Sequence, residues 1–133
     1  MNSRRLLIHS ALLIVLIFLL NYLAMQFHWY LSIWYFDMPM HFLGGLWLGL
    51  TFIWILKVKE ISLSSIIKIS VFVFFVGILW ELFEIIINET ITGDSFDTLD
   101  TISDLSFDLT GGFIAMLYFI KRIMLIDEYN IHE

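Results

Sequence analysis

The pattern of hydrophobic and polar positions divides this chain into four long apolar stretches joined by short polar segments. The stretches cover about residues 6–27, 39–56, 66–87 and 104–120. Each is long enough to cross the hydrocarbon layer of a bilayer as an α-helix, which takes about 17–25 residues. The first stretch follows two arginines, as in a signal peptide, but no small-residue cleavage site comes after it, so we predict a span there too. The pattern predicts a single all-α domain, a polytopic membrane protein with four transmembrane helices.

The charged residues indicate how these four helices are oriented. All seven Lys and Arg residues lie before the first helix, around the turn between the second and third, or after the fourth. The acidic loop 88–101 and the aromatic segment 28–37 fall at the opposite ends of the helices. Because basic residues are retained on the cytoplasmic side, we predict a plasma (inner) membrane protein with both termini cytoplasmic. Loop 88–101 would then lie outside, and 121–133 would form a cytoplasmic tail.

Composition agrees with a location in lipid. The chain is 60% hydrophobic and 15% charged, against about 45–50% and about 25% in soluble domains. It has no cysteine, which excludes disulfides, thiolate nucleophiles and zinc–sulfur sites. Its basic residues are scattered over short segments, unlike the concentrated patch that binds nucleic acid. The expected partners are therefore membrane lipids, and nucleic acid is not expected.

Five ionisable side chains lie in the predicted spans, near their outer ends. They are His41, Glu81, Glu84, Asp104 and Asp108. A helix rises about 1.5 Å per residue, which puts all of them except Asp104 roughly 5–10 Å below the outer surface. Asp104 starts its span and could serve as a wet helix cap, as Asp37 does before Pro39 in the second span. Ionisable groups at such depth are costly unless they pair or line a wet cavity, so they are candidates for function.

Two glycine pairs follow these polar residues at equal depth. Gly44-Gly45 lies one turn deeper than His41, and Gly111-Gly112 lies one turn deeper than Asp108. Small residues allow two helices to approach closely. If the glycines pack the second span against the fourth, His41 and Asp108 become neighbours.

An internal repeat of two hairpins is compatible with the sequence. Segments 37–45 and 104–112 share the spacing of their polar residues and glycines, and both begin a helix that runs inward. The same offset pairs Asn21 with Asn88. Parallel repeats of this kind occur in membrane transporters.

One histidine with several carboxylates is a ligand set for a hard or borderline divalent cation. Carboxylates that meet in a membrane cannot all stay charged without a cation, a proton or a histidinium to offset their repulsion. In the metal-binding interpretation, His41 supplies the nitrogen ligand, and Glu81 and Asp108 supply oxygen ligands. Glu84 or Asp104 is then a further ligand or the general base. A bound water would be available for hydrolysis of an envelope or lipid-linked substrate.

Two other interpretations stay open. The same carboxylates could hold a cation or relay protons in a binding or transport protein. They could also form a polar network that only fixes how the helices pack. The chain has no Gly-x-Ser-x-Gly of a serine hydrolase, and its acidic loop lacks the glycine and glutamate positions of an EF-hand. The sequence leaves open whether the protein is an enzyme.

Four motifs in this order resemble the YjdF-like family of integral membrane proteins. They are D-x-P-x-H-F-x-G-G at 37–45, W-E-x-x-E at 80–84, G-D-x-F-D-T at 93–98 and D-T-x-x-D-L-x-x-D-x-x-G-G at 100–112. The VanZ-like family is more weakly similar. Members of that family also have an Asp and a His-Phe pair at the start of a helix. Late in their sequence they have the motif Asp-x-x-x-Asn-x-x-Gly, and in the present chain Asp108 stands at the position of its Asn.

The resemblance covers about residues 36–115 and implies a small polytopic inner-membrane protein whose polar motifs face outward. It assigns no activity, although the VanZ-like similarity points to the cell envelope. The chain has fewer spans than is common in either family, and this shortness favours homo-oligomerisation.

Overall fold

The computed structural model describes residues 3–93 and 96–131, and the secondary structure in these ranges is helical. Its elements are α1 (Ser3–Gln26), α2 (Trp29–Ser32), α3 (Asp37–Ile55), α4 (Leu63–Ile87), the π-helical turn η1 (Asn88–Thr92) and α5 (Thr98–Ile131). The all-α prediction is confirmed. Three segments within the described ranges are long and apolar enough to cross a membrane: Arg4–Gln26, Asp37–Ile55 and Leu63–Ile91. α5 is a further long helix of mixed polar and apolar composition.

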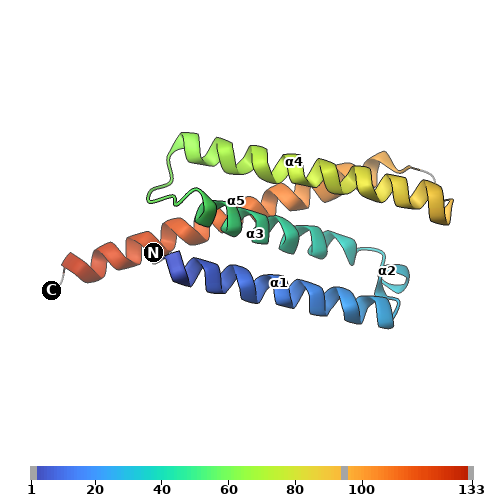
Figure 1. The fold of residues 1–133 in the computed structure, drawn as a ribbon, viewed down its shortest axis with the longest axis horizontal. Coiled ribbons are helices and arrows are strands. Elements are labelled where there is room, and N and C mark those ends of the chain that lie inside the picture. Colours follow the sequence, from blue (N-terminus) through green and yellow to red (C-terminus); the bar gives the residue numbers. More distant parts are fainter. Residues whose placement is uncertain (1–2, 94–95, 132–133) are drawn as a thin grey trace.

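The four long helices lie lengthwise beside one another, and α3 contacts the other three (Figure 1). α1 and α4 lie on either side of α3, and the most extensive contact joins α3 to α5. α3 and α5 run in the same direction, so their first residues lie at one end of the bundle. The start of α1 and the end of α5 lie at the other end (Figure 1).

Glycines bring α3 and α5 into backbone contact. A Cβ added at Gly45 would overlap the carbonyl oxygen of Asp108, and one at Gly111 would overlap that of Phe42. Side chains at these positions would therefore hold the two helices apart. This is the contact predicted from the glycine pairs, and it places His41 beside Asp108.

The start of α3 differs in one respect from the sequence-based interpretation. The helix begins at Asp37, and Pro39 stands in its first turn, where the missing N–H is tolerated. The cap position is held by Phe36, and no side chain hydrogen-bonds the helix end. Asp37 is thus the first helical residue rather than the cap. Its carboxylate faces His41, one turn further along.

α5 extends beyond the predicted span 104–120 at both ends. It begins at Thr98, where the Asp97 carboxylate accepts a hydrogen bond from the backbone N–H of Leu99 (2.9 Å). No proline occurs in it, so the helix continues through most of the predicted tail to Ile131. The predicted outer loop 88–101 is therefore partly helical, because η1 takes its beginning and α5 its end. Asp94 in that loop lies outside the described residues.

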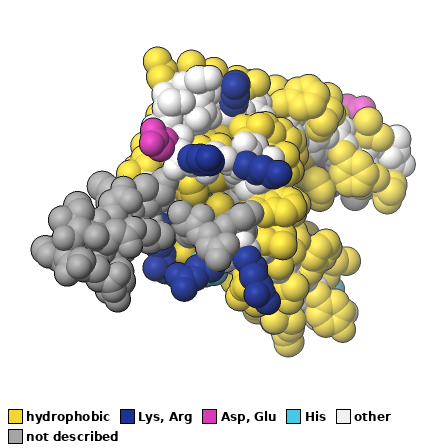
Figure 2. Space-filling view, turned by 60° about the vertical axis from the view of Figure 1, so that its left-hand side comes forward, with side chains coloured by type: hydrophobic (Ala, Val, Ile, Leu, Met, Phe, Trp, Pro, Cys, Tyr) yellow, Lys and Arg dark blue, Asp and Glu magenta, His cyan; other side chains and the backbone are white. Residues whose placement is uncertain are grey.

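Apolar side chains fill the bundle interior toward the end where α1 starts. The buried core consists of Leu6, Leu50, Ile53, Ile69, Val73, Ala115, Met116 and Phe119. Large apolar side chains also cover the outward faces of the helices, for example Val15 and Phe75, which are 64% and 58% exposed. An apolar surface of this extent suits contact with lipid rather than water. Figure 2 shows that Lys and Arg side chains gather at the end of the bundle where α1 starts.

Candidate functional site

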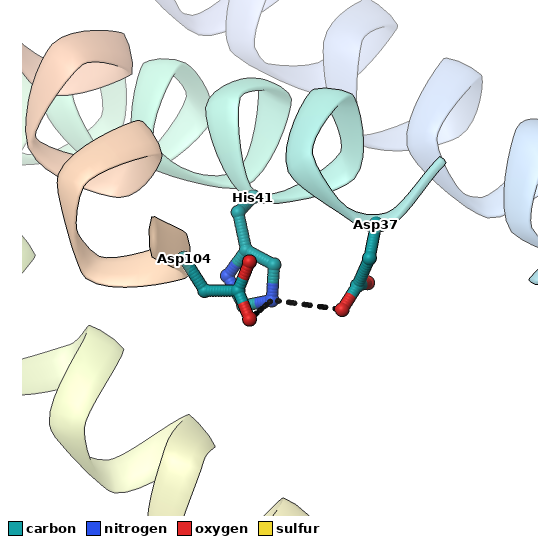
Figure 3. Close-up of side chains that lie close together, drawn as sticks. All are labelled: Asp37, His41 and Asp104. Carbon is teal, nitrogen blue, oxygen red and sulfur yellow. Dashed lines mark ion pairs between the residues drawn. The ribbon is translucent and has the colours of Figure 1, made fainter. Parts of the chain in front are cut away.

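His41 lies among three aspartates that come from two helices. Its Nε2 is 3.7 Å from Oδ2 of Asp37 on α3 and 3.8 Å from Oδ2 of Asp104 on α5. Its Nδ1 is 3.4 Å from Oδ2 of Asp108, also on α5. In Figure 3 the imidazole ring lies between the Asp37 and Asp104 carboxylates. Both ring nitrogens therefore face carboxylates.

Helical spacing explains how these side chains meet. Residues four apart share one face of a helix, which aligns Asp37 with His41 on α3 and Asp104 with Asp108 on α5. Next to Asp108, α4 has a glycine, Gly77, in place of a larger residue. A Cβ added at Gly77 would lie 2.8 Å from Oδ2 of Asp108, so this glycine leaves space for the carboxylate.

α4 adds two glutamates that lie close to the same histidine. Ligand atoms of His41, Glu81 and Glu84 lie within 4.8 Å of one another, and so do those of Asp37, His41 and Asp104. His41 therefore belongs to two groups of side chains with the chemistry of metal ligands. We refer to these residues and Asp108 together as the acidic centre: Asp37, His41, Glu81, Glu84, Asp104 and Asp108.

Most of the acidic centre is shielded from solvent. Asp104 is 1% exposed and Glu81 is 6% exposed. Two covered oxygens, Oε1 of Glu81 and Oδ1 of Asp104, have no hydrogen-bond partner among the described residues. An unpaired buried acceptor costs about 1–3 kcal/mol, and more when it is charged. Five ionised carboxylates around one imidazole would repel one another, so a cation or bound protons must offset part of their negative charge.

A small pocket of about 60 Å³ adjoins the acidic centre on the side of η1. Glu81 and Glu84 belong to both the centre and the pocket. The other polar residues that line the pocket are Asn88, Glu89, Asp97, Asp100 and Thr101. Clustered carboxylates of this kind raise the local concentration of cations at the pocket.

The structure brings together all the residues that the sequence analysis selected. The predicted contact between His41 and Asp108 is confirmed by their 3.4 Å separation. The alternative that Asp104 is a wet helix cap is wrong, because Asp104 lies well inside α5 and is almost fully covered. The metal-binding and catalytic roles of these residues stay predictions.

Asp37 in the centre and Tyr30 beside it were not selected as candidate site residues from the sequence. Asp37 carried a usable signal, since it stands four residues before His41. Tyr30 in α2 lies in the aromatic segment 28–37, and its hydroxyl donates a hydrogen bond to Oδ1 of Asn21 (2.8 Å). Burial, followed by the charges of Asp37 and Glu84, raises the pKa of Tyr30 to about 12. The hydroxyl is therefore a hydrogen-bond donor and not a base.

Comparison with known proteins identifies the family. No curated protein and no solved structure matches the chain at a significant level. The weaker similarity to the VanZ-like family is not shown by these comparisons. The model of a family described as predicted membrane protein, DUF2238, which is the YjdF-like family, matches residues 3–124. The resemblance to the YjdF-like family is therefore confirmed, and the chain belongs to the DUF2238 family of predicted membrane proteins.

Proposed function

We propose that the acidic centre binds a divalent cation near the outer face of the membrane. The observation that carries this proposal is the pair of covered oxygens, Oε1 of Glu81 and Oδ1 of Asp104, that lack hydrogen-bond partners among the described residues. They come from different helices and from the two ligand groups that share His41. A cation at this position would give both oxygens a partner and offset the charge of the surrounding carboxylates.

The arrangement around His41 supports coordination through its Nε2. Tetrahedral ligands of Zn²⁺ lie about 3.3–3.6 Å apart, and the Nε2 of His41 is 3.7 and 3.8 Å from the nearest oxygens of Asp37 and Asp104. Small side-chain movements would convert this arrangement into a coordination shell. The Nδ1 then donates to Asp108, the kind of contact that fixes the tautomer of a ligating histidine. Asp108 would orient His41 instead of serving as the ligand predicted from the sequence.

A bound cation would also provide chemistry for an enzyme. With a coordinated water, such a cation would supply a nucleophile near neutral pH. Glu84 lines both the centre and the adjoining pocket, which favours it over the more deeply buried Asp104 as the general base. An envelope or lipid-linked substrate would suit a site at this depth in the membrane.

We propose further that α5 forms a fourth span over about residues 104–120. It packs along α3 in the same direction (Figure 1), and Asp104 and Asp108 are covered inside the bundle rather than exposed to lipid. The gathering of basic side chains at one end (Figure 2) supports a cytoplasmic location for the start of α1 and the end of α5 in the plasma membrane. The parallel course of α3 and α5 agrees with an internal repeat of two hairpins.

Binding from one side has more support than transport. Deeper in the bundle the interior is filled by apolar side chains such as Ile53, Val73 and Phe119, which are at most 1% exposed. A cation that entered from the outer side would meet this core before it reached the basic end. A purely structural network would leave the two covered oxygens unpaired, at a cost that cation binding removes.

The proposal is tested by measuring the divalent-cation affinity of the purified protein in competition with a chromophoric chelator. Asp104→Asn should weaken affinity by about tenfold or more, the usual range for losing a group that ligates or orients a metal ligand. Glu60→Gln is the control, since it removes one negative charge at an exposed position in the turn between α3 and α4, outside the acidic centre and the pocket beside it. Unchanged affinity in Asp104→Asn, or equal losses in both variants, would contradict a specific site.

A further inference from the structure

A larger cavity adjoins the acidic centre from the side. It has a volume of about 330 Å³ and is lined by residues of α1, α3 and α4, by Tyr30 of α2 and by Asp108 of α5. Phe18 of α1 and Trp80 of α4 line it and are 68% and 54% exposed, so the cavity opens between these two helices. In a membrane, a sideways opening of this kind faces lipid.

The cavity wall is apolar along most of its length. α1 contributes Ile14, Ile17 and Phe18, and α4 contributes Val76 and Trp80. The lining stretch of α3 runs over residues 37–48, which corresponds to about 16 Å of helix. This combination of size, apolar wall and a few convergent polar groups is typical of a ligand site between helices.

The polar groups of the cavity are concentrated at its outer end. Apart from the indole N–H groups of Trp47 and Trp80, they belong to Asn21, Tyr30, Asp37, His41 and Asp108. Asp37, His41 and Asp108 are members of the acidic centre, so the apolar cavity ends directly at the candidate cation site. A molecule that fills both parts must have a hydrocarbon portion and a polar head.

We propose that this cavity binds the hydrocarbon chain of a membrane amphiphile whose polar head lies at the acidic centre. The surrounding bilayer supplies such molecules at high concentration, and the opening between α1 and α4 gives them lateral access. The hydrocarbon chain of the amphiphile would contact Ile14, Ile17 and Val76, while its polar head would reach Asp37 and His41. The cavity would thereby hold an amphiphile in a fixed position at the cation.

The charges at the outer end select the chemistry of the head. The carboxylates of Asp37 and Asp108 can only accept hydrogen bonds when ionised, and no Lys or Arg is among the described residues that line the cavity. The five carboxylates of the acidic centre exceed the charge of one divalent cation, so an anionic head is repelled. The head is therefore a hydrogen-bond donor without net negative charge, that is, a hydroxyl or an ammonium group.

The position of the head rests on the proposed function, because the cation and the head share the acidic centre. Binding of the amphiphile's hydrocarbon chain depends instead on the cavity walls formed by α1 and α4. These two parts can be separated by substitution. Ile17 lines the cavity, whereas its neighbour Leu16 does not and is 45% exposed. Ile17→Trp fills the cavity, and Leu16→Trp places the same bulk on the outer face of the same helix.

The experiment uses the full chain in phosphatidylcholine nanodiscs with photoreactive diazirine derivatives of dodecylamine, dodecanol and dodecanoate. Labelling is mapped by peptide mass spectrometry and compared between cavity positions Ile14 and Ile17 and the lipid-facing positions Leu12 and Val15 of α1. The amine and the alcohol should favour the cavity positions by about tenfold, which corresponds to about 1.4 kcal/mol. Dodecanoate should label both faces alike. Ile17→Trp should abolish the preference for the remaining cavity positions, and Leu16→Trp should leave it intact.

Equal labelling of both faces by all three probes in the wild type would overturn the proposal. So would a preference that survives Ile17→Trp, because the label would then lie outside the cavity. Bound divalent cation is measured on the same samples. A metal-free protein that still shows selective labelling keeps amphiphile binding and contradicts the proposed cation site. A metal-loaded protein without selective labelling contradicts amphiphile binding alone.

Discussion

The contact between α3 and α5 can be tested by two neighbouring substitutions, Gly45→Ala and Gly44→Ala. A Cβ at Gly44 would meet only the Oδ1 of Asp108, at 3.9 Å, which is an ordinary contact. A Cβ at Gly45 would overlap the backbone oxygen of Asp108 and lie 2.6 Å from its carbonyl carbon. Carbon atoms pack best at about 3.5–4.0 Å, so α5 would have to withdraw by roughly 1 Å. The backbone cannot rotate away as a side chain can.

The two substitutions should therefore change the free energy of unfolding in opposite directions. Replacing a helical glycine by alanine favours the helix by about 0.5–1 kcal/mol, and this gain should be seen in Gly44→Ala. In Gly45→Ala, overpacking of about 1–3 kcal/mol opposes the same gain. The expected difference between the variants is about 2 kcal/mol, with Gly45→Ala the less stable. Separation of the helices should also move His41 away from Asp108 and weaken cation binding.

The assay is reversible unfolding in mixed micelles of mild detergent and dodecyl sulfate, followed by tryptophan fluorescence and circular dichroism. Both variants carry the same chemical change one residue apart in the same helix, so helix propensity cancels between them. Equal stability of Gly44→Ala and Gly45→Ala would refute a direct backbone contact at Gly45. Equal cation affinity of the two variants would refute the role of this contact in positioning His41.

Two further predictions concern the role of Asp37 and the topology. Asp37→Asn should weaken divalent-cation affinity by about tenfold in the chelator competition, because its carboxylate lies 3.7 Å from Nε2 of His41; wild-type affinity would show that Asp37 only begins the helix. The chain has no native cysteine, so single cysteines can be probed in intact cells with a membrane-impermeant maleimide. Phe96→Cys, at an exposed position, should react from outside and Lys59→Cys should not; the reverse pattern would invert the topology.

Sequence reasoning succeeded where short spacings determine contacts. The glycine pairs after His41 and Asp108 indicated a close helix approach, and the structure has this approach at Gly45 and Gly111. Four-residue spacing likewise aligned Asp104 with Asp108 on α5. Such contacts could be predicted because glycine leaves few alternatives for how two helices meet.

Other features could not be derived because they depend on tertiary packing. Four-residue spacing aligns Asp37 with His41 on α3, but only the position of α5 shows that Asp104 faces the same imidazole. The first turns of α5 lack a continuous apolar stretch, so their helical structure was not evident from hydropathy. Gly77 has no paired glycine to draw attention to it, although it makes space for Asp108. The lateral cavity likewise arises only from the placement of α1 and α4 on either side of α3.

Elemental analysis of protein purified from membranes without any chelator tests the proposed cation site most directly. The acidic centre should retain about one divalent cation per chain, since its ligands are brought together by the folded bundle. At a cation concentration of about a hundred times the Kd, removal with EDTA should lower the free energy of unfolding by about 2–3 kcal/mol. In Asp104→Asn, both the bound cation and the effect of EDTA should be lost. A metal-free wild type whose unfolding is the same with and without EDTA would contradict cation binding at this site.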